Sequence, residues 1–151
     1  MMTLGGTVGA MFSFAFGDIG PLLVWLAVFV VLDYVTGILA ALRNDTWSSR
    51  ALFYGTIRKI IIFAMVALAH GLDVALHDLI HVDFVQSIVL VAYIAGEFGS
   101  IIENLEKCGL GHVVPPVFKH ILDAINLYLD RQVDKHLPSE VKSETKKPRN
   151  L

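Results

Sequence analysis

The sequence predicts an all-α integral membrane protein with three transmembrane helices. Three apolar stretches, at about 22–42, 57–76 and 84–102, are each long enough to cross a bilayer core of about 30 Å at about 1.5 Å per residue. The composition agrees, because 55% of the residues are hydrophobic and 17% are charged. The charges also lie mainly outside the three stretches, which is typical of a multi-pass membrane protein.

The first stretch, 22–42, is the clearest of the three. Its only charged residue is Asp33, near its midpoint. An acid at the centre of a membrane helix costs roughly 2.5–3.5 kcal/mol on insertion scales. Asp33 should therefore face another helix or a wet cavity and not lipid.

The second and third stretches form a predicted helical hairpin. Ser48 or Ser49 can cap a helix that starts outside the hydrocarbon, and we expect Arg58 and Lys59 to remain at the membrane surface. Asp73 should lie near the opposite interface, about 21 Å beyond Lys59. The link to 84–102 is short, which favours antiparallel neighbours.

The basic residues predict the orientation. Of the twelve Lys and Arg residues, four lie in 43–59 and eight follow residue 103, whereas the N-terminus and the link 77–83 have none. Three spans place both basic segments on one side, which the positive-inside rule makes the cytoplasm. The sequence therefore predicts an N-out/C-in topology. The basic residues expected to set it and to contact lipid at the cytoplasmic surface are Arg43, Arg50, Arg58 and Lys59.

The chain divides into four predicted segments. Residues 1–20 are a Gly- and Phe-rich segment expected at the membrane interface, and 21–104 are the three-span membrane domain. Residues 105–137 combine a Gly- and Pro-containing linker with a cytoplasmic amphipathic helix at 117–136, whose apolar side chains share one face. Residues 138–151 are charged, lack aromatic residues and are expected to be disordered.

Each span carries small or polar residues at helical spacing, a pattern that lets membrane helices approach closely. We expect these residues, with the intramembrane acids, to form an oligomer or pore face; ordinary packing within one copy is the alternative. With Arg58 and Lys59 expected at the surface, the spans hold three acids and no intramembrane Lys or Arg, so the acids should be protonated, hydrogen-bonded or hydrated. The predicted face comprises Asp33, Gly37, Ala41, Ala67, Gly71, Asp73, Ala75, Ala92, Gly96, Glu97, Ser100, Glu103 and Asn104.

Several function classes find no support in the sequence. It has no phosphate-binding loop, dinucleotide fingerprint, nucleophile elbow or zinc-protease motif, so we expect no catalytic residues, cofactor or metal. The basic tail is mixed with acids, which argues against nucleic-acid binding. His77 and His81, four residues apart, are a weak metal-site candidate that we do not favour.

The order of the motifs resembles the toxin-secretion and phage-lysis holin family. The resemblance covers roughly residues 21–116. The residues that carry it are Leu32-Asp33-Tyr34-Val35-Thr36-Gly37, Ser48-Ser49, Gly55, Arg58-Lys59, Asp73 and Glu97-Phe98-Gly99-Ser100-Ile101-Ile102-Glu103-Asn104. It implies a small phage-type protein of the bacterial cytoplasmic membrane that forms homo-oligomers.

The resemblance also implies a function. Members of this family open lesions through which an endolysin or a large toxin leaves the cell. The intramembrane acids would equally suit a small ion- or proton-coupled channel or transporter subunit. A non-conducting scaffold that recruits a partner through its amphipathic helix is the remaining alternative.

Overall fold

The computed structural model describes residues 4–18, 20–80 and 84–136. These residues form helices and loops and contain no strand, so the predicted all-α class is confirmed. Three of the helices are long and apolar enough to cross a membrane. The elements are α1 (Leu4–Phe16), α2 (Pro21–Arg43), α3 (Ser49–Ile80), α4 (Val85–Lys107), a short 3-10 turn (Gly111–Val113) and α5 (Val117–His136).

Helix α2 matches the first predicted span. Its first residue is Pro21, whose fixed φ suits the first helical position and whose missing N–H would have had no partner there. Arg43 lies in the last turn, where a cation interacts favourably with the helix dipole. Asn44 follows, and its Nδ2 donates to the carbonyls of Ala40 at 2.9 Å and Lys107 at 3.1 Å. That side chain joins the adjacent ends of α2 and α4.

Helix α3 is longer than the span predicted within it. It has 32 residues and begins at Ser49, with the Ala51 N–H donating to Ser48 Oγ at 3.5 Å. A helix of this length extends about 48 Å, well beyond a bilayer core of about 30 Å. The prediction that it begins before the apolar part of the span is confirmed.

Helix α4 begins with a cap supplied by α3. The Asp73 carboxylate accepts hydrogen bonds from the N–H groups of Val85 at 2.9 Å and Gln86 at 2.8 Å. These are two of the free donors that begin every helix, and a side chain that satisfies them contributes about 0.5–2 kcal/mol. Asp73 is buried, so this acid of the second span has a structural role at the start of the third.

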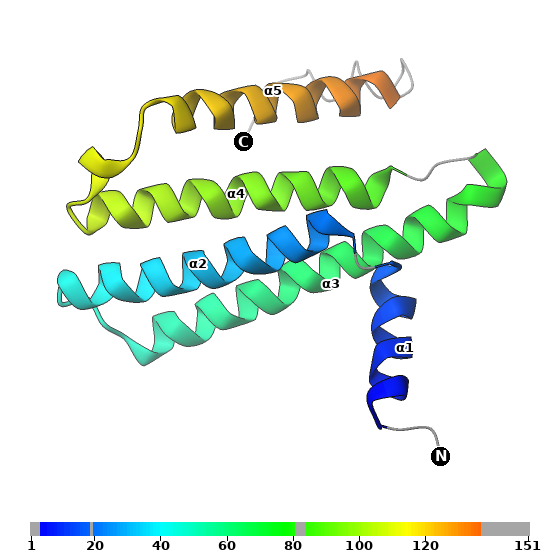
Figure 1. Cartoon of the computed structure of the whole chain (residues 1–151), viewed down its shortest axis with the longest axis horizontal. Coiled ribbons are helices and arrows are strands. Elements are labelled where there is room, and N and C mark those ends of the chain that lie inside the picture. Colours follow the sequence, from blue (N-terminus) through cyan, green and yellow to red (C-terminus); the bar gives the residue numbers. More distant parts are fainter. Residues whose placement is uncertain (1–3, 19, 81–83, 137–151) are drawn as a thin grey trace, which may run out of the picture.

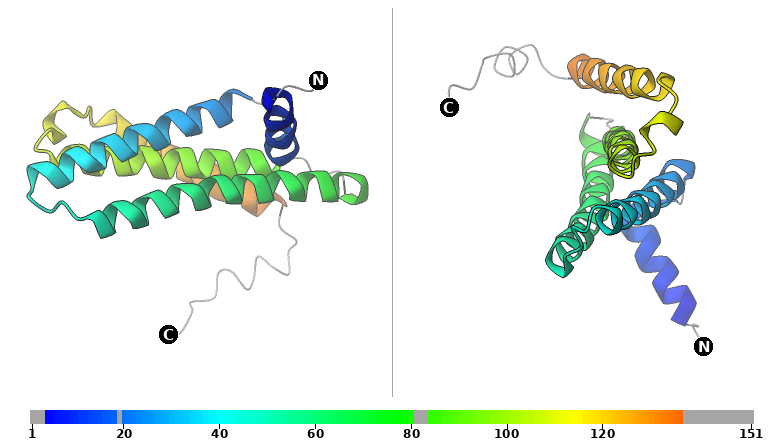
Figure 2. Two further views of the ribbon diagram at one scale, coloured as in Figure 1. Left: turned by 90° about the horizontal axis from the view of Figure 1, so that it is seen from below. Right: turned by 90° about the vertical axis from the view of Figure 1, so that its left-hand side faces the viewer.

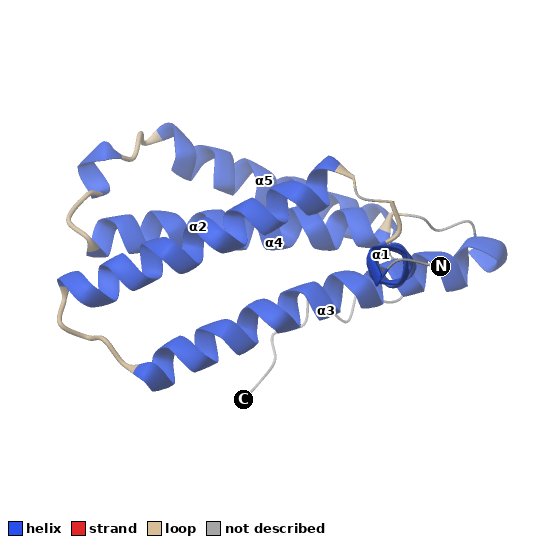
Figure 3. Cartoon of the chain, turned by 60° about the horizontal axis from the view of Figure 1, so that its bottom comes forward, coloured by secondary structure: helices blue, strands red, loops and turns tan. Residues whose placement is uncertain are grey.

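The apolar core lies between α2, α3 and α4. Its fully buried side chains include Leu26 and Val66. Helices α2 and α4 run side by side and form the most extensive contact, whereas α3 lies apart from α2 at the loop that joins them (Figures 1 and 3). Most apolar side chains on the outer faces of the spans remain exposed, which is the arrangement expected of helices surrounded by lipid.

Helix α1 points away from the three spans (Figures 1 and 2). It ends at Phe16, and the next residue, Gly17, has a φ of 71° and lies so close to His70 that an added Cβ would be 2.7 Å from the imidazole Cε1. Only glycine suits this position, because both the backbone conformation and the space exclude a side chain. Phe16 then packs edge-on against Phe63 of α3 at a ring-centroid distance of 6.4 Å. Residues 4–16 are thus helical, while their expected position at the membrane interface stays a prediction.

Helix α5 confirms the predicted amphipathic helix at 117–136. It follows the 3-10 turn and runs back over α4 in the opposite direction, crossing it obliquely (Figures 1 and 2). Phe118 packs on Phe98 at a ring-centroid distance of 5.3 Å, and Lys119 forms an ion pair of 2.9 Å with Glu106. The expected tail, 138–151, lies outside the described residues, and the division into four segments stays a prediction.

Candidate functional site

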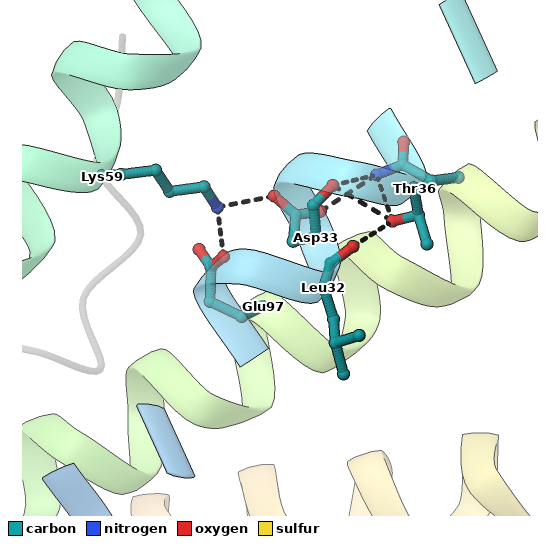
Figure 4. A network of polar contacts seen from close by, with 6 residues as sticks. Leu32, Asp33, Thr36, Lys59 and Glu97 are labelled. Atoms are coloured by element: carbon teal, nitrogen blue, oxygen red, sulfur yellow. Dashed lines mark hydrogen bonds and ion pairs between the residues drawn. The ribbon is translucent and has the colours of Figure 1, made fainter. Parts of the chain in front are cut away.

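A buried polar cluster lies where the three spans meet. We use this name for Asp33, Lys59, Glu97 and Asn104 throughout. Lys59 Nζ on α3 donates to Asp33 Oδ2 on α2 at 2.6 Å and also to Glu97 Oε2 on α4 (Figure 4). A single ammonium therefore connects all three spans.

Asn104 is the fourth member of the polar cluster and lies on α4, seven residues after Glu97. Its Nδ2 donates to Asp33 Oδ1 at 3.0 Å, so the Asp33 carboxylate accepts hydrogen bonds at both oxygens. A Cβ added to Gly37 would lie 3.4 Å from the same Nδ2, which is closer than most such contacts. The small residue at 37 thus allows α2 and α4 to approach at the level of Asn104.

The polar cluster is almost completely shielded. The exposed fraction of the side chain is 1% for Glu97, 11% for Lys59 and 12% for Asp33. No buried side-chain nitrogen or oxygen in the described part of the chain lacks a hydrogen-bond partner. Two carboxylates and one ammonium give the cluster a formal charge of −1, so shielding it from lipid requires all three helices to remain together.

This geometry corrects one sequence prediction. We expected no cation within reach of the intramembrane acids, with Lys59 remaining at the membrane surface. Lys59 instead pairs with both Asp33 and Glu97, because α2 and α3 form a hairpin that brings these positions to the same level. The expectation that these acids lack an ionic partner is therefore wrong for Asp33 and Glu97, whereas both are hydrogen-bonded, which was one of the three expected states.

A cleft of about 210 Å³ leads to the polar cluster between α2 and α3. Its lining includes Trp47 and Ser48 from the loop between the two helices, Arg58, and then Asp33 and Lys59 at its inner end. Arg58 is exposed and has no acidic partner within ion-pair distance among the described residues. The volume is sufficient for several water molecules beside the ion pair.

The remaining predicted site residues are distributed over other surfaces. On α3, the small residues Ala67, Gly71 and Ala75 line an open groove of about 800 Å³ beside α1, far along the helix from Lys59. The small residues of α2 instead line the cleft. The three small-residue stripes therefore do not form one continuous face within a single copy. The other predicted positions lie on α4 or near the ends of the spans: Ala92, Gly96, Ser100, Glu103, Arg43 and Arg50.

The sequence prediction placed Lys59 at the membrane surface and missed its place in the polar cluster. A usable signal was present, since Asp33 and Lys59 are equally distant in sequence from Thr46 in the loop between α2 and α3. Residues at equal distances from the turn of a helical hairpin lie at similar depths. The metal-site candidate of His77 and His81 is not tested, because His81 lies outside the described residues.

The three membrane-length helices and the ionic cluster between them define a multi-pass α-helical membrane protein. A comparison with family models identifies the family within this class: residues 10–126 match the bacteriophage holin family. The chain belongs to that family, a membrane pore-forming and non-enzymatic one, and is a multi-pass protein of the bacterial inner membrane. The match is wider than the resemblance predicted from the sequence, since it includes part of α1 and half of α5.

Relatives cover nearly the same part of the chain. An uncharacterized protein of Halalkalibacterium halodurans is 37% identical over 122 residues, which are 80% of this chain and 87% of that protein. One from Listeria monocytogenes is 34% identical over 128 residues, 85% of this chain and 88% of the other. The probable holin of Bacillus phage phi105 is 30% identical over 123 residues, 82% of this chain and 87% of the phage protein. No solved structure matches.

Proposed function

We propose that this protein associates with copies of itself in the bacterial cytoplasmic membrane and opens lesions that release an endolysin or a large toxin. It performs no catalysis, and it adopts the N-out/C-in orientation. The observation that carries the proposal is the polar cluster, which joins three spans of a holin-family chain through one lysine.

The polar cluster supports opening only in an assembly. In an isolated copy, separating α3 from α2 and α4 would expose two acids and a lysine to lipid, where each charge costs at least about 2.5 kcal/mol. In an assembly that admits water, the same side chains would be hydrated and this cost would disappear. Lesion formation should therefore depend steeply on the number of copies per membrane area.

An ion- or proton-coupled channel is the second candidate. The cleft favours it, because water could reach Asp33 and Lys59 from the loop end without any separation of the helices. A channel of this kind would conduct ions through single copies or small complexes and would retain folded proteins.

Liposome release distinguishes the two functions. We expect vesicles that contain only this protein to release both a small dye and an enclosed folded protein, with little release below a threshold protein-to-lipid ratio. The dye and the folded protein are measured in the same vesicles across a series of ratios. Ion flux that rises in proportion to the amount of protein, without release of the folded protein, would favour the channel; no flux at any ratio would favour a scaffold.

A further inference from the structure

Helix α5 lies against α4 over about two-thirds of the thickness of a bilayer core. Its contacts extend from Phe118, against Phe98, to Gln132, which lines a small cavity with Phe84 and Ser87 at the start of α4. These two points are fourteen residues apart on each helix, which is a rise of about 21 Å along the helix axis. Between these two points, a Cβ added at Gly99 would lie 3.9 Å from Leu122 Cδ1. Helix α5 therefore extends obliquely over the length of the span and does not lie across its end (Figure 2).

The polar face of α5 points away from α4. The residues at least partly shielded by neighbours are spaced along one stripe, which comprises Leu122, Ile125, Leu129 and Gln132. At 100° per residue, the opposite half of the helix carries Asp123, Asp130 and Asp134, all of which are exposed, together with the exposed Leu127. A flank of the apolar face is also uncovered, with Tyr128 55% exposed.

These two observations conflict for a single copy in a bilayer. A helix that follows α4 through the membrane would present three carboxylates to lipid, and each would cost at least about 2.5 kcal/mol near the centre. A helix that lies flat on the membrane surface avoids this cost but cannot keep Gln132 at the cavity that it lines with the start of α4. The docked position of α5 thus requires water on its polar face.

We propose that α5 lines the lumen of the assembled protein, with its apolar stripe on α4 and its polar face toward the α5 helices of other copies. This inference rests on the proposed function and names the element that would contact the lumen water. Before assembly no lumen exists, and α5 lies at the cytoplasmic surface where it begins, which is the N-out/C-in state. In the assembled state the C-terminal end of α5 lies inside the lumen, at the level of the start of α4. Association supplies the water that allows it to take the position along α4.

The charges of α5 suit such a ring of identical helices. On or beside the polar face, Lys119, Arg131 and Lys135 balance the three aspartates, so neighbouring polar faces would meet without a large net charge. The uncovered flank would contact lipid or the next copy. The spans α2 and α3 would remain on the lipid side, which agrees with their exposed apolar residues.

Cysteine cross-linking in liposomes tests the position of α5. The background variant is Cys108→Ser, which removes the only cysteine. The reporter pair is Ile88→Cys with Leu129→Cys, since both residues line the same cavity between α4 and α5. The control pair is Glu106→Cys with Lys119→Cys, which joins the helices near the turn and should cross-link whether α5 is docked or flat on the surface.

We expect the reporter pair to cross-link in vesicles above the release threshold, and the cross-linked protein to keep releasing the enclosed dye. The inference is wrong if the control pair cross-links but the reporter pair does not in vesicles that release dye, or if cross-linking the reporter pair abolishes release. Failure of every variant and of the parent to release dye would instead contradict the proposed function itself.

A second measurement does not depend on cross-linking. A fluorophore on Asp130→Cys should be quenched by a water-soluble quencher and not by a lipid-attached one in releasing vesicles. A fluorophore on Tyr128→Cys, on the uncovered flank, should be quenched less by the water-soluble quencher, because that flank contacts lipid or the next copy. Equal quenching of the Asp130 label by lipid would place the polar face in the bilayer or at its surface and would overturn the lumen assignment.

Discussion

Replacing Lys59 by methionine is expected to destabilise the protein by about 3–5 kcal/mol, the usual cost of removing one partner of a buried ionic contact. The variant leaves two buried carboxylates, Asp33 and Glu97, at the same level between three helices with no cation between them. Their repulsion should loosen α3 from α2 and α4. The measurement is the equilibrium unfolding of the purified protein in detergent, followed by helicity.

Two control variants isolate the ionic contact. Lys107→Met removes an exposed pair with Glu103 whose atoms are 3.9 Å apart, so we expect a change below about 1 kcal/mol. The triple variant Lys59→Met, Asp33→Asn, Glu97→Gln removes all three charges and should recover most of the lost stability, because neutral replacements of a buried ionic group are often tolerated. Similar stabilities for Lys59→Met and Lys107→Met would show that the polar cluster does not hold the spans together.

Replacing Asp33 by leucine should make membrane insertion more favourable by about 2.5–3.5 kcal/mol and should change or abolish lesion formation. The leucine removes the costly acid, but it also removes the acceptor shared by Lys59 and Asn104. Lys59 and Glu97 would remain as a neutral pair that joins only α3 and α4. We expect Asp33→Asn to be milder, because its amide oxygen can still accept a hydrogen bond.

The measurements are the fraction of protein that resists alkaline extraction from membranes and the release of dye from liposomes at matched protein density. If Asp33→Leu inserts, assembles and releases dye like the parent, then Asp33 contributes only to packing. The proposed role of the polar cluster in opening would then be wrong.

The spans could be predicted from the sequence because each depends on local properties. Length, hydropathy and the spacing of charges identified α2, α3 and α4, and the period of the apolar residues identified α5 with the bounds that the structure has. The positions of the helix ends were predicted less accurately, since α4 continues five residues beyond its predicted end at 102. The added residues include Glu103, Glu106 and Lys107, which a hydropathy criterion places outside a span although the backbone stays helical.

The contacts between spans were harder to predict. Lys59 follows an arginine at the start of an apolar stretch, a position typical of a surface residue, and only its pairing with Asp33 across the hairpin reveals that it is buried. The cap that Asp73 gives to α4 likewise depends on the path of the link between two helices. Neither interaction has a local sequence signal, because each joins residues of different helices.

The most direct test of the lesion-forming function is production of this protein in a bacterium with and without a cytoplasmic endolysin that has no export signal. The proposal predicts that the protein alone stops growth and dissipates the membrane potential after it has accumulated to a threshold, and that the endolysin then converts arrest into rapid lysis. The endolysin alone should leave the culture intact. Accumulation of the inserted protein to high density with the membrane potential maintained and the endolysin retained would contradict the proposal.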